Sequence, residues 1–255
     1  MANPEHLILL RSGALTWRDW RTQLPEIIPD LSGADLEQIN LRGANLQGVN
    51  LRGANLRGAK LIKINLQGAD LSHADLTKAQ LWSGNLAEAL LLNTCLAAAQ
   101  LYQADLRGVE AIASQFPEAD LTGADLSKAN FVGADFRDAI LQTADLSYTN
   151  LRRGNFTRAN LSGANFNHAQ LQQANLNNVE ALNCHLYQAN LQQAQLSYAH
   201  LSGSYLYGAD LQGCDLHQTD LRWANLTKAD LRNTDLTQTQ LRGANLTKIL
   251  DAGQI

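Results

Sequence analysis

The sequence predicts an all-β fold in which short extended segments wind into a stack of coils around an apolar core. From residue 31 to residue 246 every fifth residue is apolar: of these 44 positions, 37 are Leu, five are Phe and two are Ala. The residue two places earlier is Ala at 27 of 43 sites, so a small and a large side chain point the same way from an extended segment. Glycine stands two places after the apolar residue 14 times, where a tight turn requires a positive φ.

A period of five residues excludes the two common regular elements. It matches neither the 3.6-residue period of an α-helix nor the two-residue alternation of a long strand. If the chain turns through about a right angle every five residues, four sides close a coil of 20 residues, and the next coil stacks about 4.8 Å away. Residues 30–249 would then make about eleven coils. The position before each large residue is Asp 14 times and Asn 15 times, and we expect these side chains to point outward or toward the turns.

The tandem Ala-Asp/Asn-Leu-x-x pattern, as in residues 34–38 and 244–246, resembles the pentapeptide-repeat family, and most of all its Asn/Asp-rich cyanobacterial members. The resemblance covers about residues 30–250. It implies a right-handed quadrilateral β-helix of about eleven coils, and both the four-fold closure and the handedness come from the resemblance. We therefore expect residues 30–250 to form the β-helix and residues 251–255 to form a C-terminal tail.

Residues 1–29 lack the repeat and predict a short α-helical cap on the first coil. Pro4, preceded by Asn3, indicates the start of a helix, and Gly13 indicates its end. A second short helix should follow, because Thr16 and Asp19 have the spacing of a capping box. We expect the first coil to be covered by apolar side chains of this helix, and the helix to be ended by prolines: Trp17, Trp20 and Leu24, then Pro25 and Pro29.

Two segments, 108–116 and 179–186, keep the count of five but place Ala111 and Ala181 where Leu is expected. We expect a bulge or an altered turn at each. Two interpretations remain open, a tolerated irregularity and a protruding contact loop. The chain after Leu246 is only nine residues long, too short for a second cap, so the last coil is a candidate homodimer contact.

The composition indicates a cytoplasmic protein with no nucleic-acid or membrane partner. The net charge is −4 with both signs interspersed, so there is no basic surface for nucleic acid or lipid. Three cysteines without a CxxC motif argue against a disulfide framework or a zinc site. We expect no leader and no membrane span, since no apolar segment is long enough.

No group of residues predicts an enzyme, a metal site or a cofactor. Asp105, Asp125 and Asp145 are 20 residues apart and should form an acidic ladder with neighbours about 4.8 Å apart. Because Asp and Asn alternate freely at this position, repetition explains the ladder better than a pair of catalytic carboxylates does. The histidines are scattered over different positions of the repeat.

The surface features with most promise are outward positions 20 residues apart that hold apolar or aromatic side chains. Such side chains can form contacts with a partner protein, or they can simply support the stacking of coils. The candidate contact residues are Trp82, Tyr102, Leu92, Ile112, Tyr187, Tyr205 and Tyr207.

We therefore predict a non-enzymatic scaffold for protein–protein interaction, with an unidentified partner and a regulatory role as one use that the resemblance allows. The alternative comes from relatives that imitate DNA and protect DNA gyrase. Such a mimic needs dense negative charge, whereas this chain has 24 acidic and 20 basic residues, with Arg52, Arg152 and Arg232 interrupting one face.

Overall fold

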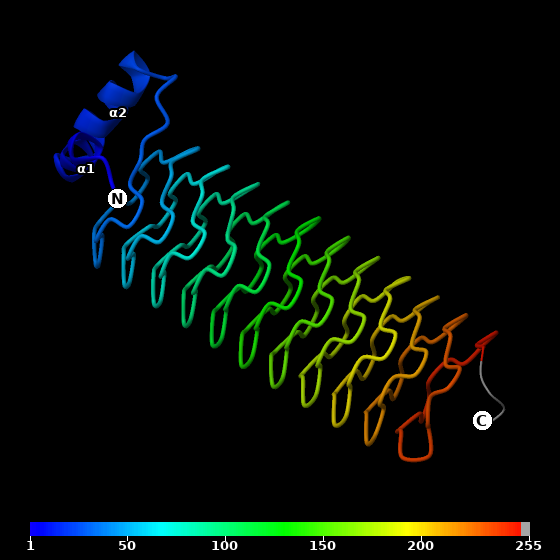
Figure 1. Ribbon diagram of the computed structural model, residues 1–255. Coiled ribbons are helices and arrows are strands. Elements are labelled where there is room, and N and C mark those ends of the chain that lie inside the picture. The colour runs from blue at the N-terminus through cyan, green and yellow to red at the C-terminus, as the bar shows by residue number, and fades with distance from the viewer. Residues whose placement is uncertain (251–255) are drawn as a thin grey trace.

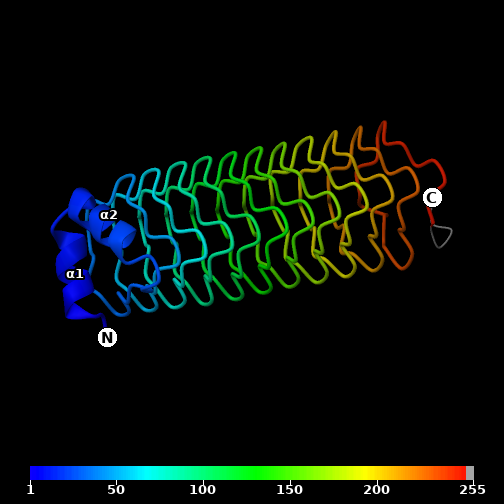
Figure 2. The ribbon, with the colours of Figure 1, turned by 90° about the horizontal axis from the view of Figure 1, so that it is seen from above.

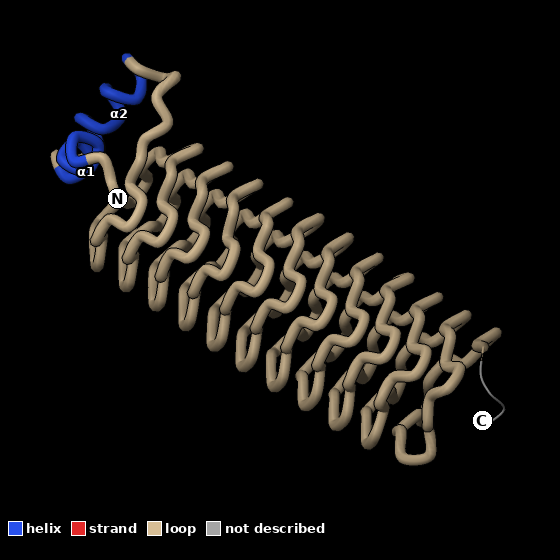
Figure 3. Tube along the Cα trace, in the orientation of Figure 1, coloured by secondary structure: helices blue, strands red, loops and turns tan. Residues whose placement is uncertain are grey.

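The computed structural model describes residues 1–250 and shows an elongated stack of similar coils with two helices at its N-terminal end (Figure 1). Each coil has four bridge positions, so each coil has four sides. The first four, Asp30, Asp35, Asn40 and Asn45, each pair in parallel with the residue 20 positions later. The same spacing continues to the bridge between Asp230 and Leu250. Each bridge is isolated, so Figure 3 shows the coils as loop rather than as strands.

Backbone hydrogen bonds join the coils in a repeating pattern. The N–H groups of Leu51 and Gly53 donate to C=O groups of the next coil, at 2.7 and 2.9 Å. Ala54 N–H donates to Leu51 C=O and closes the turn, and Asn55 N–H donates to Ala34 C=O of the preceding coil. In a regular repeat between two complete coils, four of the five N–H groups therefore have backbone partners. The fifth belongs to the first turn residue, here Arg52.

This fifth N–H explains why Asp and Asn dominate the position before each large residue. Arg52 N–H donates to Oδ1 of Asn50 at 3.1 Å, and Arg222 N–H donates to Oδ1 of Asp220 at 3.0 Å. This Asx turn recurs along the solenoid at nearly every Asp and Asn in that position. Asp and Asn both offer the required oxygen at the required reach, and that is why they share the position almost equally.

Two substitutions of Asp220 separate the contribution of the Asx-turn hydrogen bond to stability from the contribution of the carboxylate charge. The pKa of Asp220 lies below its ordinary value, chiefly because side-chain N–H groups of Arg222 donate to the carboxylate at 2.7 and 2.9 Å. A carboxylate with a depressed pKa stabilises the fold above its unfolded pKa of about 3.9, and this contribution is lost as the pH falls toward the folded pKa. Thermal melts between pH 2 and pH 7 should therefore show that Asp220→Asn lowers the melting temperature at pH 7 but converges with the wild type in acid.

Asp220→Ala is the matched variant, because it also removes the acceptor of the Arg222 N–H. It should stay less stable than Asp220→Asn at every pH, by about 1 kcal/mol. Equal stability of the two variants would contradict the role given to the Asx turn.

The turns have the expected geometry even where glycine is absent. Gly53 has a φ of 66° and Gly213 has a φ of 64°. Non-glycine residues adopt the same conformation at the equivalent position, as His73 does with a φ of 61°. The ladder bond from this residue's N–H to the next coil, at 2.8 Å for His73, holds the strained conformation in place.

The large repeat residues fill the interior of the stack. The five Phe side chains are 0–2 % exposed, as are nearly all of the Leu side chains between residues 46 and 171. Phe116, Phe136 and Phe156 stack along one side with ring centroids 4.9 Å apart, and Phe131 packs edge-on against the first two. Aromatic pairs of this geometry add to the stability gained from burial.

No bulge forms at 108–116 or 179–186, because both segments keep the ladder between coils. The turn after Ala111 is regular, with Ser114 N–H donating to Ala111 C=O at 3.3 Å. The turn after Ala181 is altered as expected, because Cys184 N–H donates to Oγ of Ser204 at 3.0 Å and not to Ala181 C=O. Glu110 bridges to Asn130 and Glu180 bridges to His200, and both Ala111 and Ala181 donate to the next coil at 2.8 Å. The ladder uses only backbone groups, so a smaller interior side chain does not break it. Near Ala181 the missing volume remains as a void of about 10 Å³, lined by Phe166, Cys184 and several leucines.

The two helices are α1 (Pro4–Arg11) and α2 (Ala14–Gln23). Asn3 caps α1, because its Oδ1 accepts from Glu5 N–H at 2.9 Å, which agrees with the predicted start at Pro4. Trp17 is 1 % exposed, and its Nε1–H donates to Asn45 C=O at 2.8 Å. Figure 2 shows the helix pair at the end of the solenoid, against the first coil.

The helix pair supplies hydrogen-bond partners that the first coil would otherwise lack. Trp20 packs partly buried against the core, as expected for it. The expectation for Leu24 is wrong, because its side chain is 44 % exposed just after the end of α2. Polar groups of residues 1–23 bond backbone groups of the first coil on three of its sides; these groups are Asn3 N–H, His6 Nδ1, and side-chain N–H groups of Arg11, Trp17 and Arg21.

The regular stack opens once, close to its C-terminal end, where Figure 1 shows a widened loop. Within the described part of the chain, no ladder bond joins residues 214–218 to residues 233–238. A cavity of about 190 Å³ lies between these two segments, lined by Leu216, His217 and Thr237 among others. The tail 251–255 lies outside the described residues.

Candidate protein-contact surface

The predicted contact residues lie on three different corners of the solenoid. Trp82 and Tyr102 stand one above the other on adjacent coils, because Ser83 N–H donates to Tyr102 C=O. Leu92 and Ile112 are likewise joined through Asn93 N–H and Ile112 C=O, on a second corner. The three tyrosines share a third corner. The structure therefore gives three separate patches instead of one surface.

The tyrosine corner carries a continuous line of rings, which we call the aromatic ridge and define as Tyr148, His168, Tyr187, Tyr205, Tyr207 and Lys228. Tyr148 stacks on His168 with centroids 4.8 Å apart, and His168 meets Tyr187 edge-on at 5.3 Å. Tyr187 stacks on Tyr207 at 5.7 Å, and Tyr205 lies 6.2–6.3 Å from both. The side chain of Tyr148 is among the most exposed of these, at 59 %.

Two further interactions fix the ridge. Nζ of Lys228 lies 5.2 Å from the ring centroid of Tyr207, within the range of a cation–π attraction. Tyr187 N–H donates to Oδ1 of Asn167 in the preceding coil at 2.9 Å, because His185 stands where an Asx acceptor would otherwise lie. Sequence reasoning missed Lys228, although it is 80 residues from Tyr148 and so occupies the same position of the coil.

The other two patches are smaller. Trp82 and Tyr102 are 44 % and 43 % exposed, and they border a depression of about 530 Å³ together with Gln100, Glu118 and Asp120. Ile112 is 41 % exposed, whereas Leu92 is half-buried between neighbouring turns. Each patch spans two coils, while the ridge spans five.

The reactive side chains have structural partners. Asp105 and Asp125 bridge as the predicted ladder, but Asp105 is paired with Arg107 at 2.6 Å. The thiols of Cys184 and Cys214 donate to interior C=O groups at 2.9 Å, and burial raises the pKa of both to about 12. Both thiols therefore stay protonated and pack as small apolar groups.

Over residues 1–250 we find no group of three or more His, Cys, Asp or Glu side chains placed to bind a metal ion. None of the helices in that range has the length and apolar character needed to cross a membrane.

Four sides per coil, one apolar residue per side and a ladder spacing of 20 residues define a four-sided repeat solenoid. The family model for pentapeptide repeats matches residues 30–178 and residues 184–249, in stretches that overlap within each of these two ranges. This chain belongs to the pentapeptide-repeat family, whose fold is the right-handed quadrilateral β-helix.

Two solved structures are similar to this chain over most of its length. HetL, a pentapeptide repeat protein involved in heterocyst differentiation regulation from the cyanobacterium Nostoc sp. strain PCC 7120, is 33 % identical over 88 % of this chain and 92 % of that chain, with a TM-score of 0.39. QnrB1, a plasmid-mediated fluoroquinolone resistance protein, is 22 % identical over 86 % of this chain and 87 % of that chain, with a TM-score of 0.31. A search of curated protein sequences gave no match.

Proposed function

We propose that this chain is a non-catalytic, cytoplasmic scaffold for protein–protein interaction, and that the aromatic ridge is its main contact surface. The observation that carries the proposal is the continuous contact of five rings and one ammonium group over five coils. The ladder does not require these rings, since its hydrogen bonds are the same at corners with small polar residues. No hydrogen bond among the described residues uses the hydroxyl groups of Tyr148, Tyr187 or Tyr205, so these groups are free for a partner.

The ridge is tested by the double variant Tyr187→Ser, Tyr207→Ser. Aromatic hot spots contribute about 2 kcal/mol or more each, so a partner captured by the wild-type protein from cell extract should bind the variant at least roughly thirtyfold more weakly. Affinity is measured with the purified partner by surface plasmon resonance. The matched control is Trp82→Ser, Tyr102→Ser, which removes two aromatic side chains from another corner.

The outcomes separate the patches. If only the control variant loses affinity, the contact lies at Trp82 and Tyr102 and the ridge proposal is wrong. If the ridge variant binds normally but melts at a clearly lower temperature, the rings serve coil stacking, as cross-strand pairs do.

The gyrase alternative receives less support from the surface charge. A DNA duplex carries one negative charge per about 1.7 Å, evenly along its length. Here many carboxylates are neutralised by a neighbouring arginine at 2.6–2.7 Å; the pairs are Asp105–Arg107, Asp135–Arg137, Asp138–Arg158, Asp220–Arg222 and Asp230–Arg232. We therefore expect no inhibition of purified gyrase in a supercoiling assay at micromolar protein.

A homodimer through the last coil is a second proposal, supported by the incomplete burial of the apolar residues in that coil. Leu241, Leu246 and Ile249 are only partly buried, whereas Leu221 and Leu226 one coil earlier are fully buried. Sedimentation equilibrium should give the mass of two chains, and Leu246→Glu should give the mass of one. A monomeric wild-type protein at high micromolar concentration would rule out this contact.

A further inference from the structure

The backbone on one side of the first coil receives no hydrogen bond from the helix pair. On the other three sides, groups of residues 1–23 bond the C=O of Asp30, Asp35 and Asn45. On the side formed by residues 39–43, no described residue bonds the N–H or C=O of Asn40 or the C=O of Arg42. Asn40 and Arg42 are exposed, so this is an unpaired backbone edge at the surface.

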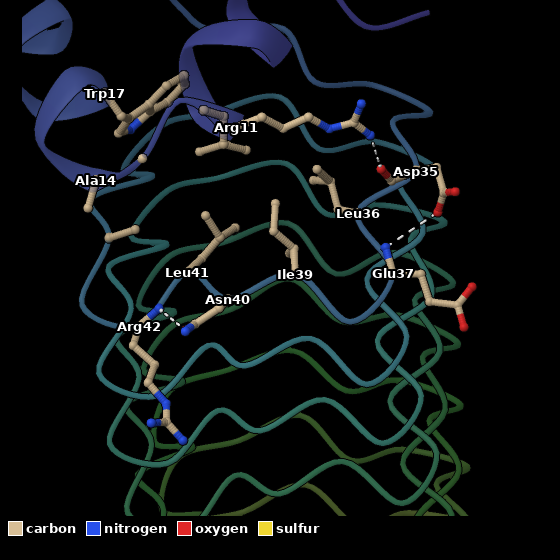
Figure 4. A pocket seen from close by; sticks show the side chains of 13 residues that line it. Arg11, Ala14, Trp17, Asp35, Leu36, Glu37, Ile39, Asn40, Leu41 and Arg42 are labelled. Carbon is tan, nitrogen blue, oxygen red and sulfur yellow. Dashed lines mark hydrogen bonds between the residues drawn. The ribbon is translucent and has the colours of Figure 1, made fainter.

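A cavity of about 500 Å³ lies directly above this edge, between it and the helix pair. Figure 4 shows the side chains of Leu36, Ile39 and Leu41 pointing into this space, below Trp17 and Ala14 of α2. Arg11 closes one end, where its Nη2 donates to Asp35 C=O at 2.9 Å. The space has an apolar floor and a polar rim, and its volume is typical of ligand-binding pockets.

We propose that this cavity binds an extended peptide segment of the pattern small–polar–Leu, which adds to the edge at Asn40 as a parallel strand. The occupant follows from the ladder, which shows what each side accepts from its neighbour. One coil down, Lys60 N–H donates to Ile39 C=O, while Leu41 and Gly43 N–H donate to Lys60 and Ile62 C=O. A peptide repeating this pattern one coil up satisfies all three free groups.

The bonds formed can therefore be assigned atom by atom. Asn40 N–H donates to the C=O of the small peptide residue. The N–H of the peptide leucine donates to Asn40 C=O, and the N–H two residues later donates to Arg42 C=O. Strand addition of this kind obtains affinity from main-chain bonds and specificity from the side chains that enter pockets.

The side-chain pattern follows from the same register. The peptide leucine stacks over Leu41, which is 7 % exposed because nothing covers it fully, whereas Leu61 below it is at 0 %. The small residue stacks over Ile39, which is partly buried. A bulky residue there would meet α2, and a charged residue in place of leucine would be buried without a partner.

The test uses the labelled hexapeptide Gly-Ala-Asn-Leu-Arg-Gly, which has the sequence of residues 53–58, with blocked ends. Binding is measured by fluorescence anisotropy, and amide hydrogen exchange at Asn40 should slow when the peptide is present. N-methylation of the peptide leucine removes the donor to Asn40 C=O and should weaken binding about tenfold or more. N-methylation of the peptide asparagine, whose N–H points away from the edge, is the matched control and should leave affinity within twofold.

Two protein variants locate the site. Ala14→Trp fills the cavity from an exposed position of α2 and should weaken peptide binding at least tenfold. Leu15→Trp adds the same ring at the next position, which is 66 % exposed and outside the cavity, and should not change binding. Ridge variants should not change it either, so this inference and the ridge proposal fail independently.

Three results would overturn the inference. One is the absence of binding at millimolar peptide, and another is equal affinity of the two N-methylated peptides, which would mean side-chain insertion without strand addition. The third is self-association of the protein that Ala14→Trp abolishes while peptide binding is undetectable, which would assign the cavity to a second copy.

Discussion

Leu141→Asp is expected to abolish the cooperative folding of the coils around it. Leu141 is fully buried in the middle of the stack, and its N–H donates to Asn160 C=O at 2.7 Å. An unpaired carboxylate at this position costs several kcal/mol, a large part of the 5–15 kcal/mol that stabilises a typical domain. Because each coil contacts only its neighbours, the damage should spread to the adjacent coils first. Far-UV circular dichroism and hydrogen exchange resolved along the chain measure both effects.

Gln142→Asp is the control for this prediction. It places the same charge on the next residue, which is exposed on the turn, and should change stability by no more than about 0.5 kcal/mol. Similar melting of the two variants would mean that the interior of the solenoid tolerates charge, and the description of the core would have to be abandoned.

Trp17→Ala should give the second largest effect, by detaching the helix pair. The side chain is 1 % exposed and its ring lies 5.2 Å from that of Trp20. Removing a buried tryptophan typically costs about 3–5 kcal/mol. It also frees Asn45 C=O and exposes the first coil, and an exposed backbone edge favours edge-to-edge association. We therefore expect faster hydrogen exchange in residues 30–49 and larger particles in light scattering.

Trp17→Phe and Trp223→Ala divide this effect into its parts. Trp17→Phe keeps a ring but loses the Nε1–H donor, so a smaller loss of about 1 kcal/mol is expected for the hydrogen bond. Trp223 is 65 % exposed, and its replacement by alanine should leave both exchange and scattering unchanged. A Trp17→Ala protein that behaves like Trp223→Ala would show that the helix pair is not held by this residue.

The sequence predicted the stack of coils because every repeat has the same surroundings. The same pattern of a small, a polar and a large residue therefore recurs on each side. The period defined the five-residue sides, and the four-fold closure implied by the family resemblance supplied the 20-residue register, from which Tyr187 and Tyr207 could be placed on adjacent coils. The expected bulges at Ala111 and Ala181 do not form, because the ladder depends on backbone groups and not on the size of the interior side chain. The altered turn, which was the other expectation, occurs after Ala181 but not after Ala111.

Other features depend on contacts between parts of the chain and carry no periodic signal. The opening between residues 214–218 and 233–238 falls in repeats with the ordinary pattern. The unpaired backbone edge at Asn40 results from the way α1 and α2 lie against the first coil. The sequences of the two helices do not predict that arrangement. The role of Asp and Asn depends on which backbone N–H the ladder leaves without a backbone partner, and the residue pattern alone does not show this.

The Asx turn has a consequence for how solenoids of this kind can change over generations. In each repeat the N–H of the first turn residue needs one acceptor oxygen on the side chain two residues earlier. Asp and Asn supply that oxygen equally well. Exchanging one for the other alters the charge of a face by one unit while the winding stays the same. The surface charge of the solenoid can therefore change one repeat at a time without a change in its fold.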